Sequence, residues 1–440
     1  MFALKNEIAI GYKQGTVVLS DLNDVLPTRY LSKKNSALLY ALTNFDLSKD
    51  YYINALGVTK EDIDDFIVSI CDYIYDAGSG FVGKMSKVSD KLFIIPSKTI
   101  SNKYKLDYPN MISWVPTWVC NRNCLYCGVP RTADIDKEKR IDPEIITSIL
   151  KEAIDHGVRS LNIHGGEPLF YYDLDVLFDL IRYACNKNVK VLLSSKNKIN
   201  NTLAHKLADT GLRTMQLSLD AMDDVLLKSI YGPDYVLSDF VESVKTLKRH
   251  NIDVVVNVVV TTLNYKYVKK LLAFLEELHV DTVKLSPYKK GNNNGVDYSM
   301  NENEKILLHQ DFKESDKHRS TKIIFSPFQP KVVSVKNKGL CGGGRNELLI
   351  LPDGTCCLCD MLYADKRFIF GDLINDSIED IWLGDDLNKL ISPCAIADRP
   401  ICKVCPEITI CAERGFCYAE TTQDHSLPDG RSLECLGSLC

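Results

Sequence analysis

Apolar and polar positions recur with two periods along the central part of the chain, roughly residues 111 to 300. Short apolar runs typical of buried strands alternate with stretches in which apolar residues lie three and four positions apart, as on one helix face. The predicted strands are Ile112–Val119, Ser160–Ile163, Val189–Leu193, Thr214–Leu219, Val254–Val260 and Thr282–Leu285. The predicted helices are Pro143–His156, Leu174–Cys185, Thr202–Thr210, Phe240–Arg249 and Tyr267–His279. Six such βα units predict an α/β fold, a partial (β/α)6 barrel that is open on one side.

The N-terminal part of the chain follows a different pattern. Ile8–Tyr12 and Thr16–Leu19 alternate apolar and polar positions on either side of a Lys-Gln-Gly turn, which predicts a β-hairpin. Thr59 and Asp62 have the spacing of a capping box, so a helix is predicted to begin there and to continue to about Tyr75. Short strands combined with small helices predict a winged-helix-like module.

The C-terminal part is rich in cysteine, glycine and short turns. We expect bound metal, rather than a large apolar core, to hold it together. The predicted units are therefore an N-terminal winged-helix-like module (1–85), a linker (86–110), the partial barrel (111–300), a bridging region (301–339) and a Cys-rich domain (340–440).

The overall composition, with 45% hydrophobic and 25% charged residues, is ordinary for a globular protein. The net charge of −5 gives no general attraction to nucleic acid or to an anionic membrane. No run of about 18 apolar residues predicts a membrane-spanning helix. The first residues lack a basic segment followed by an apolar core, so we expect no signal peptide and a cytoplasmic location. Neither nucleic acid nor membrane is an expected partner.

Sixteen cysteines are unusual for such a protein, because in a reducing compartment clustered cysteines bind metal or carry out redox chemistry. Cys120, Cys124 and Cys127 have the spacing C-x3-C-x2-C directly after the first predicted strand. Three thiolates can hold three irons of a cubane cluster and leave the fourth iron open to a small molecule. The alternative is a zinc site completed by a distant Cys or His. Cys71 and Cys185 stand alone in helical patterns and are expected to be buried.

A second motif, His164-Gly-Gly-Glu-Pro, follows the second predicted strand. By itself it predicts either a tight turn ended by proline or a turn whose glycines allow a ligand to approach the backbone. Combined with the triple-cysteine loop, it resembles the radical S-adenosylmethionine (SAM) enzymes, in which the open iron binds SAM. The resemblance implies a 4Fe–4S cluster on Cys120, Cys124 and Cys127, and SAM contacts from Tyr126 near the adenine and from Gly165, Gly166 and Glu167 near the amino group.

The Ser-Leu-Asp segment that ends the fourth predicted strand matches this family's Ser-x-Asp pattern. The resemblance implies that Ser218 binds the SAM ribose or carboxylate and that Asp220 orders the loop; the alternative is a helix N-cap. Asn257, on the fifth strand, is a further candidate for contact with SAM. Two positions depart from the family. Lys196 lies where relatives have a Thr-Asn-Gly segment, and Tyr231-Gly replaces Arg-Gly, so we expect some other cation to hold the SAM carboxylate.

The C-terminal cysteines resemble the SPASM extension of radical SAM peptide maturases, which carries two auxiliary 4Fe–4S clusters. The pattern is Cys341-x12-Gly354-x4-Cys359, then Cys402-x2-Cys405-x5-Cys411-x5-Cys417, then Cys435. Its departure from the family is the last interval of the quartet, five residues instead of the usual three. The resemblance implies one auxiliary cluster on Cys341, Cys359 and Cys417, and another on Cys402, Cys405, Cys411 and Cys435. The fourth ligand of the first cluster stays open between Cys356, Cys357, Cys394 and an open iron; Cys440 is an alternative to Cys435, and zinc ribbons are an alternative to both clusters.

The chain is thus similar to radical SAM/SPASM maturases of ribosomally made peptides, of the streptide-synthase or sactionine type. This resemblance implies three 4Fe–4S clusters, SAM, an external one-electron donor of flavodoxin or ferredoxin type, and a precursor peptide whose leader binds the N-terminal module. The 5′-deoxyadenosyl radical would abstract hydrogen from the peptide, and a carbon–carbon or thioether cross-link would form. The alternatives are a sulfatase-type formylglycine maturase, a peptide epimerase and an iron–sulfur redox-sensing regulator. No side chain in the sequence stands out as an acid or base for the cross-linking step.

Overall fold

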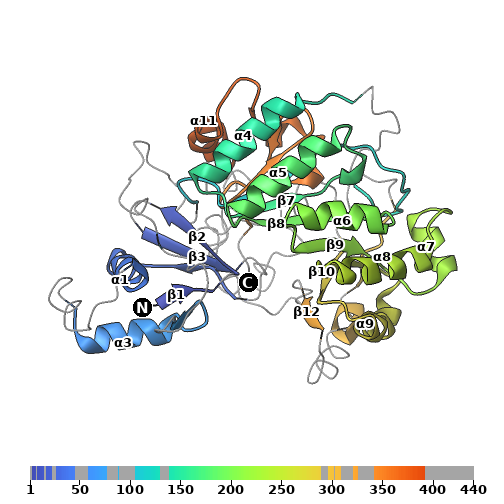
Figure 1. The fold of residues 1–440 in the computed structure, drawn as a ribbon, viewed down its shortest axis with the longest axis horizontal. Coiled ribbons are helices and arrows are strands. Elements are labelled where there is room, and N and C mark those ends of the chain that lie inside the picture. Colours follow the sequence, from blue (N-terminus) through green and yellow to red (C-terminus); the bar gives the residue numbers. More distant parts are fainter. Residues whose placement is uncertain are drawn as a thin grey trace. The chain divides into compact units, whose positions relative to one another are not determined.

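The computed structural model describes residues 2–5, 7–13, 16–21, 26–44, 58–76, 88, 105–128, 138–288, 296–301, 303–308, 321–325 and 341–391. The chain divides into two compact units, Met1–Asn110 and Met111–Cys440 (Figure 1). None of the helices in these described ranges combines the length and the apolar character needed to cross a membrane.

The described residues of the first unit form two small antiparallel sheets and two helices. Its elements are β1 (Phe2–Leu4), β2 (Ile8–Lys13), β3 (Thr16–Asp21), β4 (Arg29–Tyr30), α1 (Lys33–Asn44), α3 (Lys60–Ser69) and β5 (Ile74–Asp76). The predicted hairpin is confirmed, because β2 pairs with β3 from Ile8↔Asp21 to Lys13↔Thr16. β4 continues this sheet, and β1 pairs separately with β5. Leu38, Leu39, Ile63 and other apolar side chains of both helices fill the core. That the unit is a winged-helix-like module stays a prediction.

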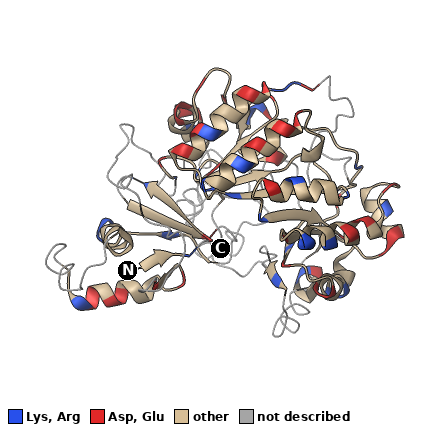
Figure 2. Cartoon of the chain, viewed as in Figure 1, with Lys and Arg blue, Asp and Glu red and all other residues tan. Residues whose placement is uncertain are grey.

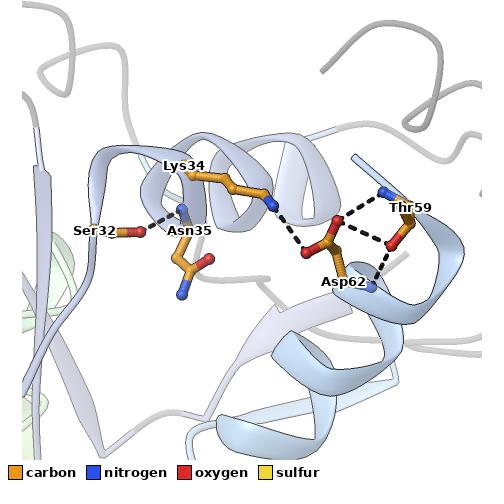
Figure 3. A network of polar contacts seen from close by, with 5 residues as sticks. All are labelled: Ser32, Lys34, Asn35, Thr59 and Asp62. Carbon is orange, nitrogen blue, oxygen red and sulfur yellow. Dashed lines mark hydrogen bonds and ion pairs between the residues drawn. The ribbon is translucent and has the colours of Figure 1, made fainter. Parts of the chain in front are cut away.

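Helix α3 begins at the predicted capping box. The Thr59 hydroxyl accepts from the Asp62 N–H at 3.0 Å, and the Asp62 carboxylate accepts from the Thr59 N–H at 2.8 Å (Figure 3). The helix ends at Ser69, so its predicted continuation to Tyr75 is wrong. The chain turns after Ser69 and returns as β5, where Tyr75 pairs with Ala3. Acidic side chains predominate on α3 (Figure 2).

The described residues of the second unit form a ten-stranded sheet with the order β12-β11-β10-β9-β8-β7-β6-β13-β14-β15. Its strands are β6 (Met111–Trp114), β7 (Ser160–Ile163), β8 (Lys190–Ser195), β9 (Thr214–Ser218), β10 (Asp253–Val260), β11 (Thr282–Pro287), β12 (Lys322–Phe325), β13 (Glu347–Ile350), β14 (Thr355–Cys357) and β15 (Ile369–Asp372). β6 to β12 are all parallel, so the predicted α/β class and its six central strands are confirmed. The outermost described strands are β12 and β15, and the described part of the sheet does not close into a barrel.

Helices follow the strands as the pattern predicts. They are α4 (Pro143–His156), α5 (Leu174–Asn186), α6 (Asn201–Asp209), α7 (Asp224–Tyr231), α8 (Leu237–Arg249) and α9 (Val268–Glu277), with α11 (Ile378–Leu383) and α12 (Asp385–Leu390) near the C-terminal end of the described chain. Short 3-10 helices are η3 (Pro168–Phe170), η4 (Tyr265–Tyr267), η7 (Asp360–Leu362) and η8 (Lys366–Phe368). Figure 1 shows α4, α5 and α6 following one another along the sheet. α7 was not predicted.

Residues 341–391 contain a substantial apolar core, so the expectation that metal rather than apolar packing holds this region is wrong for its described part. Trp382 is completely buried, as are Leu348 and Ile350. β13 pairs in parallel with β6, which makes this region a direct continuation of the central sheet. A second correction concerns Cys71, which is exposed instead of buried.

Candidate active site

The candidate site lies at the carboxyl ends of the central strands. Because β6 to β11 are parallel, the segments that follow them meet at one edge of the sheet. The cysteine loop follows β6, the Gly-Gly-Glu-Pro turn follows β7, Lys196 follows β8, and Ser218 is the last residue of β9. Asn257 lies opposite Ser218 in the register of β10 and β9. The sequence motifs are therefore brought together.

The cysteine loop is fixed by the end of α7. The N–H of Asn123 donates to the carbonyl of Tyr231 at 3.0 Å, and the N–H of Leu125 donates to the carbonyl of Ile230 at 2.8 Å. Within the loop, the N–H of Cys127 donates to the carbonyl of Cys124 at 3.1 Å. Burial raises the pKa of the Cys124 thiol. The helix that the sequence pattern missed thus holds the loop in place.

The two glycines of the second motif are required by the packing of the protein itself. A Cβ on Gly166 would lie 2.5 Å from backbone atoms of Trp118 and Val119, and Gly165 has a φ of +129°. The N–H of Gly166 donates to the carbonyl of Thr117 at 3.0 Å. The turn after β7 therefore presses directly against the segment that enters the cysteine loop.

Glu167 is 1% exposed and joins two strand ends. Its carboxylate accepts hydrogen bonds from the N–H of Lys196 at 3.0 Å and from the N–H of Leu169 at 3.3 Å. Burial raises the pKa of Glu167, and these donors partly offset the rise. The carboxylate is thus engaged with the chain's own backbone, and its contact with SAM stays a prediction.

Lys196 extends its side chain to the cysteine loop. Its Nζ lies 3.5 Å from Sγ of Cys124, and it lies 4.8 Å and 5.4 Å from the ring centroids of Tyr231 and Tyr126. Burial disfavours the charged ammonium, yet the nearby Cys124 and Asp220 keep the pKa of Lys196 above its ordinary value. The ammonium group of Lys196 therefore lies near the Asp220 carboxyl group and near the Cys124 thiol, both of which are negative when deprotonated.

Asp220 orders the loop after β9, as expected. Its carboxylate accepts from the phenol of Tyr126 and, at 2.8 Å, from the N–H of Val259. Burial raises its pKa. The N-cap alternative is wrong, because the residue that caps α7 is Asp223, whose carboxylate accepts from the N–H of Leu226 at 2.8 Å.

Arg122, inside the cysteine loop, is a cation that the sequence motifs did not identify. Its Nη2 lies 3.4 Å from the carbonyl of Lys196 and 3.3 Å from Oδ1 of Asn197, and its guanidinium lies over the ring of Tyr235 at 5.1 Å. These residues and Ser218 line a narrow pocket between the ends of β8 and β9. The position of Arg122 between Cys120 and Cys124 could have identified it from the sequence, because a cation there is close to any anionic ligand of the cluster.

Two of the predicted SAM contacts are half-buried at this edge. Ser218 faces the pocket with Arg122, and its carbonyl accepts from the phenol of Tyr235 at 3.3 Å. The amide oxygen of Asn257 accepts from the hydroxyl of Ser286 at 2.8 Å. Both residues lie at the edge of the sheet from which the cysteine loop extends. Their binding of SAM stays a prediction.

Part of the C-terminal cysteine set lies within the described residues. Cys341 begins a glycine turn that touches the segment before Cys359, since a Cβ on Gly343 would lie 2.5 Å from the carbonyl of Leu358. The ring of Trp118, just before the cysteine loop, contacts that of Tyr363 at 5.3 Å between centroids, with the two planes tilted by 46°. Cys356 and Cys357 are buried in β14. The other predicted ligands, Cys402, Cys405, Cys411, Cys417 and Cys435, lie outside the described residues, as do Cys394 and Cys440.

In the ranges that the structure describes, no three His, Cys, Asp or Glu side chains converge as metal ligands do. The fit to an iron–sulfur cluster therefore rests on the chemistry of the donors. Three thiols in one loop, two of them half-buried and one buried, are the ligands such clusters use. A lysine beside them offsets negative charge. This donor set suits a 4Fe–4S cluster.

Comparison with known proteins identifies the class. Residues 114–275 match the family model described as the radical SAM superfamily, and residues 341–406 match SPASM, an iron–sulfur cluster-binding domain. The chain is therefore a radical SAM enzyme that carries a SPASM domain. The cofactors that these domains imply are 4Fe–4S and SAM.

Individual relatives fall into two groups. A probable GTP 3′,8-cyclase of Sulfurisphaera tokodaii is 27% identical over 266 residues, which cover 59% of this chain and 83% of that protein. Streptococcus suis SuiB bound to the precursor peptide SuiA has a TM-score of 0.70 at 16% identity, covering 99% of both chains. The anSMEcpe structure with bound AdoMet and Cp18Cys peptide has a TM-score of 0.53 at 17% identity, covering 75% of this chain and 95% of that one.

Proposed function

We propose that this enzyme modifies a ribosomally made precursor peptide and forms a cross-link within it, either carbon–carbon or thioether. The observation that carries the proposal is the fold correspondence with SuiB, a protein solved with a precursor peptide, over 99% of both chains. That correspondence includes Met1–Asn110, a unit outside both family models. The anSMEcpe structure with a bound peptide corresponds to less of the chain, 75%.

A second candidate is chemistry on a nucleotide. It is favoured by the curated relatives, which are GTP 3′,8-cyclases at 25–28% identity. The match to the first of them covers 59% of this chain, which leaves much of it without a counterpart. The two candidates share the cysteine loop and differ in substrate, so a direct test separates them.

A 4Fe–4S cluster bound here would supply the one electron needed to cleave SAM into methionine and a 5′-deoxyadenosyl radical, the species that would abstract hydrogen from the substrate. Cys120, Cys124 and Cys127 would hold this cluster. Arg122 would bind the SAM carboxylate, since its planar guanidinium suits a carboxylate and borders the pocket at the β8 and β9 ends. Ser218, which lines the same pocket, would contact the ribose or carboxylate.

The SPASM domain would add two auxiliary clusters, for three in total. Cys341 and Cys359 are the described members of the first. The ring of Tyr363, four positions after Cys359, lies 5.3 Å from the ring of Trp118, two positions before Cys120. These clusters would accept the electron released when the cross-link forms. An external one-electron donor of flavodoxin or ferredoxin type would reduce the site cluster, and the cytoplasm would keep the thiols reduced.

The N-terminal unit would bind the leader as an added strand. The outer edge of β2 is already engaged, because the N–H of Ile8 donates to the carbonyl of Lys5 and the N–H of Asp107 donates to the carbonyl of Tyr12, both at 2.9 Å. A sheet edge of this unit other than that of β2 would receive the leader, and leader binding should slow hydrogen exchange at the amides of the strand with which it pairs.

The test begins with a search for a short open reading frame beside the gene. Its peptide is then co-expressed with the enzyme and measured by mass spectrometry. A peptide that loses two hydrogen atoms supports a cross-link. An unchanged mass with altered stereochemistry indicates an epimerase instead. In parallel, the anaerobically reconstituted enzyme is incubated with SAM, dithionite and GTP, and a cyclised nucleotide without peptide modification would overturn the proposal.

A further inference from the structure

We propose that Lys196 is a positioning residue for the site cluster: its ammonium group holds Cys124 and places a fixed positive charge beside the cluster. The proposal rests only on the presence of a cluster in the cysteine loop. It holds whether the substrate is a peptide or a nucleotide.

The backbone of Lys196 is fixed on both sides. Its N–H donates to the Glu167 carboxylate at 3.0 Å, and its carbonyl accepts from Arg122 at 3.4 Å. These contacts tie the end of β8 to the turn after β7 and to the cysteine loop. The starting point of the side chain is thus set independently of any ligand.

The side chain then passes aromatic rings on its way to sulfur. The ammonium lies 4.8 Å from the ring centroid of Tyr231 and 5.4 Å from that of Tyr126, and it ends 3.5 Å from Sγ of Cys124. Both aromatic faces favour a cation there. The distance to sulfur is that of a hydrogen bond from an ammonium to a thiol or thiolate. The geometry directs the charge to one particular ligand of the cluster.

The charge is needed because negative groups gather at this point. Asp220 is 1% exposed, and Cys124 becomes a thiolate when it binds iron. Without Lys196, the buried Asp220 and the thiolate would face each other with no cation from the β8 end. A positive charge and a hydrogen bond to a cluster sulfur both favour the reduced cluster, so they raise its reduction potential.

The competing role for Lys196 is direct binding of the SAM carboxylate. The two roles differ in when the residue matters. A positioning role acts on the cluster before SAM is present, whereas a SAM ligand leaves the SAM-free cluster unchanged.

The experiment compares Lys196→Met, Lys196→Gln and Lys196→Arg with the wild type after anaerobic reconstitution of the full chain. The site-cluster potential is measured without SAM by EPR-monitored redox titration. Its signal is identified as the one absent from a Cys120→Ala/Cys124→Ala/Cys127→Ala variant. The matched control is Lys198→Met, because Lys198 is two positions away and forms exposed ion pairs with Asp239 and Glu242.

We expect a more negative site-cluster potential in Lys196→Met and Lys196→Gln, a potential restored toward the wild type by Lys196→Arg, and no change in Lys198→Met. If Lys196→Met loses the site cluster altogether, the glutamine variant decides, since its amide keeps a hydrogen-bond donor without a charge. A wild-type potential in Lys196→Gln overturns the proposal. So does a wild-type potential in Lys196→Met combined with SAM affinity reduced at least about tenfold, which would assign Lys196 to SAM.

Discussion

The phenol of Tyr126 donates a hydrogen bond to the carboxylate of Asp220, 94 positions later in the chain. Tyr126 belongs to the cysteine loop, and Asp220 follows β9 and also accepts from the N–H of Val259 in β10. One buried carboxylate therefore connects the loop to two strands of the sheet.

Replacing Tyr126 by Phe should destabilise the loop, because the Asp220 carboxylate loses one of its donors while remaining buried. The expected cost is about 1–3 kcal/mol, the range for a hydrogen bond to a buried charged group. Thermal unfolding of the reconstituted enzyme and its iron content would show the change. The control is Tyr235→Phe, which removes a neutral 3.3 Å hydrogen bond to the Ser218 carbonyl and should cost less. Equal effects of the two substitutions would contradict this role for Asp220.

The contact between Tyr126 and Asp220 could not be predicted from the sequence. Tyr126 and Asp220 each belong to a local motif, but their contact depends on the neighbours of β9, which no local pattern encodes. Helix α4 was predicted with its observed bounds because Asp142 caps it and Gly157 ends it. Local signals of this kind are strong and are read directly.

The elements that were missed depend on distant partners. β12 has only four residues, and its pairing with β11 is what identifies it as a strand. β13 pairs with β6, which lies more than 200 positions earlier in the chain. The first strand was predicted too long because Pro116, which has no N–H to donate, lies just beyond the observed end at Trp114. The sequence stays apolar beyond Trp114, but the regular strand pairing of β6 ends at that residue.

The capping box of α3 gives a test confined to the first unit. Thr59→Ala should cost about 1 kcal/mol, because it removes the side-chain acceptor for the Asp62 N–H. Lys34→Ala, which removes the exposed 2.8 Å ion pair to the same Asp62 (Figure 3), should cost less than about 0.5 kcal/mol. Hydrogen exchange at the amides of Lys60–Ser69 reports on this helix alone. Comparable exchange rates in the two variants would show that the cap does not stabilise α3.

Lys13 predicts a pH dependence. Its side chain is 9% exposed and donates to the carbonyl of Lys105 at 2.7 Å, and burial lowers its pKa to about 8. The unfolded chain has the higher pKa, so it binds more protons between that value and about 10.4, and the folded state gains stability as the pH rises through this window. Below pH 8 the full penalty for burying the charge is present.

Lys13→Met should therefore flatten the rise in urea midpoint between about pH 8 and pH 10 relative to the wild type. The difference between the two proteins isolates Lys13 from the tyrosines and cysteines that titrate in the same range. Lys33→Met, at an exposed position in the first turn of α1, is the control and should follow the wild-type curve. Parallel curves for Lys13→Met and the wild type would mean that Lys13 keeps its ordinary pKa.

Gly166→Ala tests the contact between the second motif and the cysteine loop. The added Cβ would lie 2.5 Å from the backbone of Trp118 and Val119, and backbone atoms cannot rotate away as a side chain can. The segment that enters the loop must then shift, so we expect loss of the site cluster. This loss would be seen as a lower iron content and the absence of the site-cluster EPR signal, with the auxiliary signals retained.

Gly157→Ala is the matched control, because Gly157 at the end of α4 has a φ of 142° and its substitution strains the backbone without touching the loop. It should lower thermal stability and keep the site cluster. A full site-cluster signal in Gly166→Ala would show that the turn does not position the loop.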